Sequence, residues 1–83
     1  MSEVSILIRT ADQTRKAGVT LSLQTTGADV IQAAVDNWAL PTDTDYSLVN
    51  VTQGKSLVPS AILGTGGVKS GDTLEIQPVL QAG

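Results

Sequence analysis

The sequence predicts an α+β fold in which one helix packs on one face of a mixed sheet of four or five strands. Segments 4–9, 19–23 and 73–77 alternate apolar and polar residues, which is the period of a half-buried strand. In segment 30–38 the apolar residues instead recur at helical spacing. A helix between the first and last strands allows these two strands to pair in parallel in the middle of the sheet.

The first predicted strand is segment 4–9, followed by a polar hairpin loop over 11–18 and a second strand over 19–23. Val4, Ile6 and Ile8 share one face of the first strand. Leu7 adds apolar surface to the opposite face, which is typical of a central strand that is partly covered on both sides.

The predicted helix begins after Thr26, because Thr26 and Asp29 have the spacing of a capping box. It ends at Leu40–Pro41, since the residue before a proline avoids the helical region. Its apolar stripe consists of Val30, Ile31, Ala34, Val35 and Trp38.

Beyond a polar loop over 41–45, the sequence predicts short elements. A third strand covers 46–51 and a fourth covers 56–58, with a turn over 53–55 between them. One helical turn is expected over 59–63, followed by a flexible connection over 64–67 and by Val68, which we expect to fill the core.

The last predicted strand follows a turn at Gly71–Asp72. Leu74 and Ile76 lie on one face, and the polar residues at 73, 75 and 77 lie on the other. Pro78 has no N–H group and therefore limits further pairing.

The amino-acid composition narrows the range of possible functions. The 83 residues fit one domain with a net charge of −3, and the five basic residues form no dense run, which argues against nucleic-acid binding. The chain contains neither His nor Cys, so we expect it not to be an enzyme and to bind no metal or other cofactor. Without a signal peptide or a long apolar run, the predicted location is cytoplasmic, with no membrane partner.

Two short stretches resemble the ubiquitin family. Val68-Lys69-Ser70-Gly71-Asp72-Thr73-Leu74-Glu75-Ile76 is similar to the Ile-Gln-Lys-Glu-Ser-Thr-Leu-His-Leu run of ubiquitin, without gaps. Gly54-Lys55-Ser56-Leu57 resembles its Gly-Lys-Gln-Leu turn. The order of elements is also that of the β-grasp, so the resemblance implies a ubiquitin-like β-grasp domain over residues 1–78 and a flexible C-terminal tail over 79–83.

The resemblance implies a protein modifier. Gly83 aligns with the terminal glycine, whose carboxylate an E1-like enzyme adenylates with ATP and takes as a thioester. An E2-like enzyme then delivers the carboxylate to amines of target proteins, and a JAMM-type or other isopeptidase reverses the bond. The aligned positions of tail recognition are Val79, Leu80, Gln81 and Ala82.

Several positions depart from the ubiquitin pattern. Ala82 stands where the family usually has a second glycine, and Val79 and Gln81 replace two arginines. Glu75 and Gln77 occupy positions of the recognition patch of ubiquitin, so we expect ubiquitin receptors to bind poorly. Val49 or Val51 supplies the central aliphatic residue of this candidate partner surface. The pattern fits a bacterial ubiquitin-like modifier with dedicated enzymes.

Two other roles remain open. The first is a non-covalent ubiquitin-like interaction module of the kind that accompanies secretion systems, for which the last two residues would be dispensable. The second is a sulfur carrier with a C-terminal thiocarboxylate, which Ala82 disfavours because such carriers typically end in Gly-Gly. For a modifier that forms chains, Lys55 is the best candidate acceptor lysine, because it lies in a predicted turn.

Overall fold

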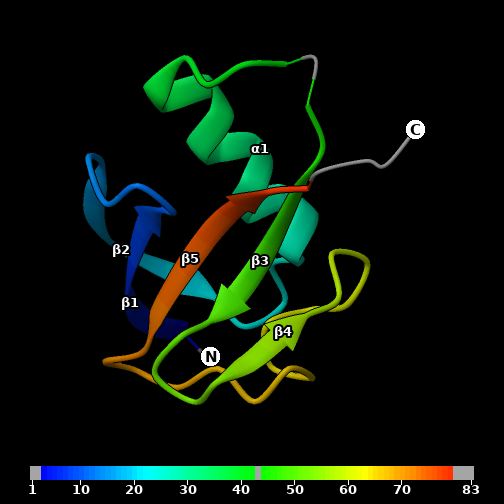
Figure 1. Cartoon of the computed structure of the whole chain (residues 1–83). Helices are drawn as coiled ribbons and strands as arrows, with labels where there is room; N and C mark the ends of the chain where they lie inside the picture. Colours follow the sequence, from blue (N-terminus) through cyan, green and yellow to red (C-terminus); the bar gives the residue numbers. More distant parts are fainter. Residues whose placement is uncertain (1–2, 43, 80–83) are drawn as a thin grey trace.

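The computed structural model describes residues 3–42 and 44–79, and these form a five-stranded sheet with one helix on one face (Figure 1). The elements follow in the order β1 (Glu3–Thr10), β2 (Lys16–Ser22), α1 (Gly27–Trp38), β3 (Tyr46–Asn50), β4 (Lys55–Leu57) and β5 (Thr73–Pro78). The strand order is β2-β1-β5-β3-β4, and β1 and β5 are parallel whereas the other pairs are antiparallel. The predicted α+β fold and its central parallel pair are confirmed.

The core lies between α1 and the inner face of the sheet. Alternate residues of β1 and β3 are buried, as expected for strands with one covered face. The central strand β5 buries Glu75 as well as Leu74 and Ile76. Because aromatic residues are 2% of the sequence, aliphatic side chains fill this space. The buried cluster consists of Val4, Ile6, Ile8, Val30, Ala34, Leu48, Leu57, Leu63, Val68, Leu74 and Ile76.

The loop between β1 and β2 is shorter than predicted. β2 begins at Lys16 and ends at Ser22, whereas the sequence predicted a strand over 19–23. The Asp12 carboxylate accepts hydrogen bonds from the hydroxyl groups of Thr10 and Thr14 and from the backbone N–H of Thr14. Such an Asx-type turn lets the strands pair from the first residue after the loop.

The helix begins as predicted and ends earlier than predicted. Thr26 is the N-cap, and its hydroxyl oxygen accepts a hydrogen bond from the Asp29 N–H at 3.1 Å. At the other end, Ala39 adopts the left-handed conformation with φ 51°, and its N–H donates to the Val35 carbonyl. The predicted stop at Leu40–Pro41 is therefore wrong, because Ala39 already caps the helix that ends at Trp38.

The segment after β3 differs most from the sequence predictions. β3 ends at Asn50 and β4 occupies Lys55–Leu57, so each boundary lies one residue before its predicted place. Val58 was predicted in the fourth strand, but it follows β4 and is 61% exposed. Segment 59–63 forms turns and a bridge between Ile62 and Thr26 instead of the predicted helical turn.

The connection over 64–67 is held by backbone hydrogen bonds. Gly64 donates to the Leu23 carbonyl at 3.0 Å, and Gly66 donates to the Ile62 carbonyl at 3.2 Å. A Cβ at Gly66 would lie 2.8 Å from a methyl carbon of Leu57, so a larger residue here would force the Leu57 side chain to move. Val68 follows with 5% exposure, which confirms its predicted place in the core.

A buried carboxylate fixes the turn that leads into β5. One oxygen of Asp72 accepts hydrogen bonds from the side chains of Asn50 and Gln53 and from the Lys69 N–H, at 2.9, 2.7 and 3.0 Å. The Asn50 bond is the main cause of the lowered pKa of Asp72. This cluster ties β3 to the start of β5 and thereby fixes the register of the two strands.

Candidate interaction face and the start of the tail

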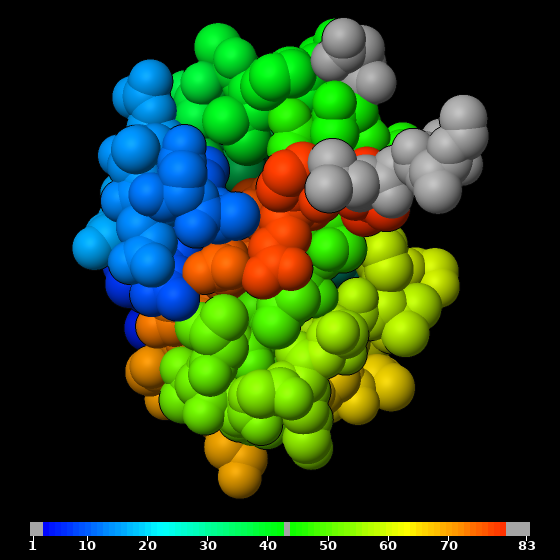
Figure 2. All heavy atoms as spheres, in the orientation of Figure 1, coloured from blue at the N-terminus to red at the C-terminus, as the bar shows by residue number. Residues whose placement is uncertain are grey.

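The face of the sheet opposite α1 brings together three of the four residues predicted as a partner surface. In the antiparallel register of β3 and β5, Val49 lies opposite Glu75 and Ser47 lies opposite Gln77. We call the central part of this surface the helix-free face, which consists of Leu7, Arg9, Ser47, Val49, Thr73, Glu75 and Gln77. In Figure 2, β5 (orange to red) is visible as a band between the β1–β2 loop (blue) and β3 (green).

The register also decides between the two candidate valines. Val49 is within β3 and lies beside Glu75, so it is the aliphatic residue at the centre of the helix-free face. Val51 follows β3 in the turn towards β4, and its N–H donates to the Thr73 carbonyl at 3.0 Å. Val51 is therefore placed at the end of this face, and Val49 is the candidate that lies at its centre.

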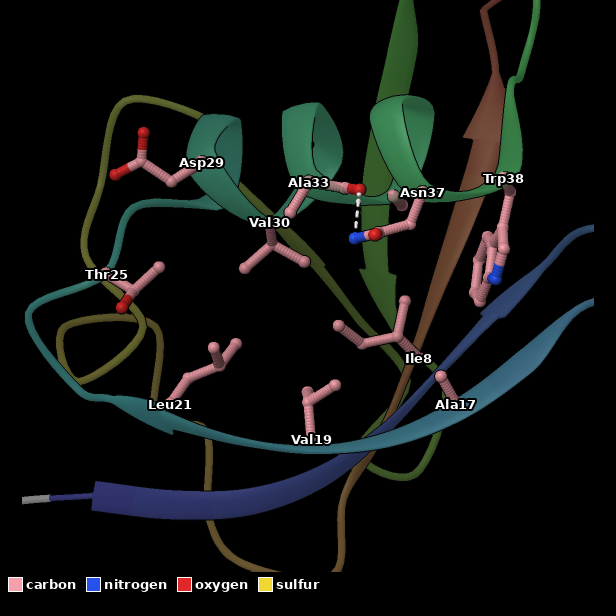
Figure 3. Close-up of a pocket in the computed structure, with 11 residues that line it drawn as sticks. Ile8, Ala17, Val19, Leu21, Thr25, Asp29, Val30, Ala33, Asn37 and Trp38 are labelled. Atoms are coloured by element: carbon pink, nitrogen blue, oxygen red, sulfur yellow. Dashed lines mark hydrogen bonds between the residues drawn. The ribbon is translucent and has the colours of Figure 1, made fainter.

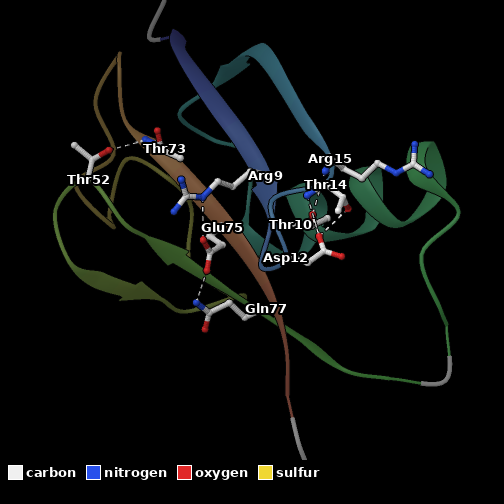
Figure 4. A network of polar contacts seen from close by, with 9 residues as sticks. All are labelled: Arg9, Thr10, Asp12, Thr14, Arg15, Thr52, Thr73, Glu75 and Gln77. Carbon is white, nitrogen blue, oxygen red and sulfur yellow. Dashed lines mark hydrogen bonds and ion pairs between the residues drawn. The ribbon is translucent and has the colours of Figure 1, made fainter.

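Glu75 forms the polar centre of the helix-free face. One carboxylate oxygen accepts a bond from the Arg9 guanidinium at 2.9 Å, and the other accepts a bond from the Gln77 amide at 2.7 Å (Figure 4). The Gln77 bond is the first cause, followed by Arg9, of a Glu75 pKa below its usual value. With 8% exposure, Glu75 is a buried, paired carboxylate and not a free surface charge.

Arg9 was not among the site residues predicted from the sequence. It occupies an outward position of β1, and the parallel register with β5 places it opposite Glu75. The signal was present as opposite charges on two strands that were predicted to be neighbours. Using it required the register, because a shift by one residue would turn Arg9 to the other side of the sheet.

The end of β5 lies at the surface. Pro78 is opposite Tyr46, the first residue of β3, and the next residue still pairs, because the Val79 N–H donates to the Asp45 carbonyl at 2.8 Å. Pro78 therefore limits pairing less than predicted. Val79 itself is 40% exposed. Leu80, Gln81, Ala82 and Gly83, to which tail recognition and conjugation were assigned, lie outside the described residues.

Lys55 is the first residue of β4 and is exposed. β4 is an edge strand, opposite in the sheet to the other edge strand, β2. The predicted acceptor lysine is therefore accessible and far along the sheet from the β1–β2 loop.

Within residues 3–42 and 44–79, no three His, Cys, Asp or Glu side chains are grouped as a metal site would require. In the same residues, no helix has the length and apolar character needed to cross a membrane.

This chain is similar to known proteins in its structure but not in its sequence. No family model and no curated protein matches the sequence. Among solved structures, a ubiquitin from Caldiarchaeum subterraneum superposes with a TM-score of 0.77 at 22% identity, covering 99% of this chain and 100% of that one. A protein designed de novo on the basis of ubiquitin gives a TM-score of 0.78 at 20% identity, covering 98% and 94%.

A third similar structure is the tubulin-binding cofactor B of Trypanosoma brucei, with a TM-score of 0.74 at 12% identity, covering 98% of this chain and 100% of that one. These identities are too low to transfer a function, and the similarity concerns the arrangement of elements. Together with the central parallel β1–β5 pair and the single helix that crosses the sheet, the likeness shows that this chain has the ubiquitin-like β-grasp fold.

Proposed function

We propose that this chain is a ubiquitin-like protein modifier that is joined to amines of target proteins through the carboxyl group of Gly83. The observation that carries the proposal is the end of β5. This central strand lies between β1 and β3, reaches the surface at Pro78 and makes its last described backbone bond from Val79 to Asp45. The described part of this strand therefore ends at a defined place beside the helix-free face.

The proposed chemistry is carried out by partners. An E1-like enzyme uses ATP to adenylate the carboxylate and takes it as a thioester, and an E2-like enzyme passes it to the target. In this proposal Leu80 anchors the tail in a groove of the activating enzyme, while Val79, Gln81 and Ala82 line a narrow channel. Glycine at 83 permits close approach to the reacting carbonyl, and a JAMM-type or other isopeptidase uses the same access.

The modifier itself supplies no catalytic group in this proposal and holds no cofactor, and its place of action is the cytoplasm. Lys55 is the proposed acceptor for chains, because it is exposed on the edge strand β4.

The helix-free face supports the use of dedicated partners. Its centre combines Val49 with the Arg9–Glu75 ion pair and the Gln77 amide. A partner that covers this face must leave Glu75 its two hydrogen bonds, because a buried carboxylate that loses its donors is costly. Partners that recognise a purely apolar patch are therefore disfavoured.

Conjugation is tested in the native host with an N-terminally tagged chain. We expect higher-mass species on a denaturing gel, and mass spectrometry should find an isopeptide between Gly83 and a target lysine. Deletion of Gly83 should abolish these species, whereas the matched tail variant Ala82→Gly should retain them. If the deleted form and the intact form gave the same single band, conjugation would be rejected.

The second candidate is a non-covalent interaction module, which the ordered mixed surface of the helix-free face favours. Comparing deletion of Gly83 with the substitution Val49→Asp separates the two roles. The substitution should weaken partner binding in either role, while deletion of Gly83 should weaken only the covalent one. A sulfur carrier would instead show a thiocarboxylate in the intact mass of the protein purified from its host.

A further inference from the structure

An apolar groove lies between α1 and the edge strand β2, on the side of the sheet opposite the helix-free face. It has a volume of about 350 Å³ and opens to solvent. Figure 3 shows Val19, Leu21, Ile8 and Val30 directed into it from the sheet and the helix. Trp38 closes one end of the groove beside Ala17, and Thr25 and Asp29 lie at the other end.

The groove is open because β2 has no neighbour on its outer side. The inward residues of β1 are buried, whereas Ala17, Val19 and Leu21 on the same face of β2 are only half-buried. Opposite them, α1 presents the small side chain of Ala33, which leaves room between the helix and the strand. The apolar side chains of β2 therefore lack the cover that an additional strand would supply.

The free edge of β2 also carries unused backbone groups. Thr10 donates to Arg15 across the β1–β2 ladder, while Leu7 donates to Asp72 on the β5 side. Because donors alternate in an antiparallel ladder, the odd-numbered residues of β2 bond to β1. The N–H and C=O groups of Lys16, Gly18 and Thr20 consequently point to the free edge. At Ser22 only the N–H is unused there, because its carbonyl already accepts a bond from the Thr25 N–H at 3.0 Å.

The two ends of this edge carry opposite charges. Arg15 and Lys16 are exposed at the start of β2. At its other end, Glu3 is exposed opposite Ser22, and the exposed Asp29 on α1 lines the same end of the groove as Thr25. Within the part of the chain that the structure describes, the one salt bridge joins Arg9 to Glu75, so these four charges have no ion-pair partner there.

We propose that two copies of this chain associate through antiparallel pairing of their β2 strands about a twofold axis. An interface of this kind must be self-complementary. Antiparallel pairing places the basic end of one β2 against the acidic end of the other. The charges along this edge are therefore complementary to those of a second copy of the chain. The register that pairs all seven residues of β2 is centred on Val19.

In this register Lys16 lies opposite Ser22 of the second copy and two strands from its Glu3. Adjacent strands are about 4.8 Å apart, so the Lys16 and Glu3 side chains can meet above the small serine. On the groove side, Ala17 lies opposite Leu21 and Val19 opposite Val19. Each copy thus supplies the strand that covers the half-buried aliphatic side chains of the other, and both exposed β2 edges become paired.

Sedimentation equilibrium over a wide range of concentration tests the proposal on the full chain. We expect a monomer–dimer equilibrium. Lys16→Glu should weaken the dimer by on the order of tenfold, because the change acts twice across the axis. Combining it with Glu3→Lys should restore association. Lys55→Glu, on the opposite sheet edge, makes the same change in net charge and should have no effect.

Amide hydrogen exchange of the unsubstituted protein is a second test of the dimer. The Gly18 and Thr20 amides should exchange more slowly at high than at low protein concentration, while the Val19 amide, already bonded to β1, should change little. Purely monomeric behaviour, or equal weakening by Lys55→Glu and Lys16→Glu, would overturn the proposal. Neither experiment involves Gly83, so the outcome is independent of conjugation.

Discussion

Among the described residues, Asp12, Asp72 and Glu75 are carboxylates whose hydrogen-bond donors lower their pKa values. Asp12 accepts three bonds within the β1–β2 loop, Asp72 joins β3 to the start of β5, and Glu75 joins β5 to β1. A hydrogen bond to an ionised carboxylate favours the charged form. At the scale of the residue, these carboxylates make the stability of the fold depend on pH, because each must be ionised to keep its hydrogen bonds at full strength.

Asp12 is expected to titrate near pH 2, because the hydroxyl groups of Thr10 and Thr14 and the Thr14 N–H lower its pKa from the usual 3.8 to about 2. The folded-state pKa is depressed, so the contribution of Asp12 to stability is present above the usual value and is lost as pH falls through about 2. NMR titration of the carboxyl carbon measures the pKa directly. In Asp12→Asn the corresponding pH-dependent loss of stability should be missing, and an unchanged acid-unfolding curve would contradict this.

Removing the charge of Glu75 should destabilise the domain. Glu75→Gln weakens two hydrogen bonds to a buried carboxylate, and we expect a loss of about 1.5 kcal/mol in the free energy of unfolding at neutral pH. Urea denaturation measures the loss, and a double-mutant cycle with Arg9→Gln should give a coupling of about 1 kcal/mol. Additive effects of the two substitutions would mean that the ion pair contributes nothing.

The same pair has a pH dependence of defined sign. Gln77 first and Arg9 second hold the pKa of Glu75 below the usual 4.5. The stabilising contribution is therefore present above that value and is lost as pH falls through the lower folded-state pKa. The difference in stability between the wild type and Glu75→Gln should shrink on acidification, and urea midpoints at neutral and acidic pH measure it. A difference that grew as the pH fell would reverse the assigned sign.

At the scale of the element, the two ends of α1 differ in how well the capping residue suits its backbone conformation. Its N-terminus is satisfied by Thr26, whose hydroxyl accepts the Asp29 N–H. Its C-terminus uses Ala39 at φ 51°, a left-handed conformation that L-residues with a Cβ adopt at a cost. The second bond of this cap runs from the Leu40 N–H to the Val35 carbonyl at 3.1 Å. The helix therefore ends at a cap that needs a left-handed residue, and alanine at position 39 is not the best residue for that conformation.

Ala39→Gly should stabilise the protein by about 1 kcal/mol, because glycine adopts positive φ without strain. The matched control is Ala33→Gly on an exposed position inside α1, where the same change should destabilise by about 1 kcal/mol. Thermal or urea unfolding of both variants gives the comparison. If both substitutions destabilised equally, the strain assigned to Ala39 would be absent.

At the scale of the whole molecule, the segment between β4 and β5 completes the core without being a regular element. Leu63 is 1% exposed and Val68 is 5% exposed, although both lie in turns or irregular chain. Leu63 is held by a hydrogen bond from its N–H to the Thr25 carbonyl at 2.8 Å, just before α1. The loop thus covers the end of the core between the start of the helix and β4.

Leu63→Ala should cost about 3 kcal/mol, as expected for a cavity in a well-packed core. Val58 precedes it by five residues and is 61% exposed, so Val58→Ala should change stability by less than about 0.5 kcal/mol. Chemical denaturation of the two variants measures both values. Similar losses at the two positions would contradict the assignment of Leu63 to the core and of Val58 to the surface.

Much of the fold could be predicted because its signals are local. Alternation of apolar and polar residues identified β1, β2 and β5, helical spacing identified α1, and the Thr26 cap was placed correctly. The errors lie at boundaries where a distant contact decides. Val58 and Leu63 have similar apolar character, and only the packing of the loop against α1 and β4 determines which of them is buried.

The sequence by itself determined the order of the strands around one long helix, together with the inward or outward side of the residues in the first and last strands, because these follow from backbone periodicity. Tertiary structure alone decided what depends on register and on distance. It placed Arg9 against Glu75, selected Val49 over Val51 for the helix-free face and left the groove open between α1 and β2. Residues 66 apart in the chain, such as Arg9 and Glu75, meet only once strand register is fixed, and register is a property of the assembled sheet.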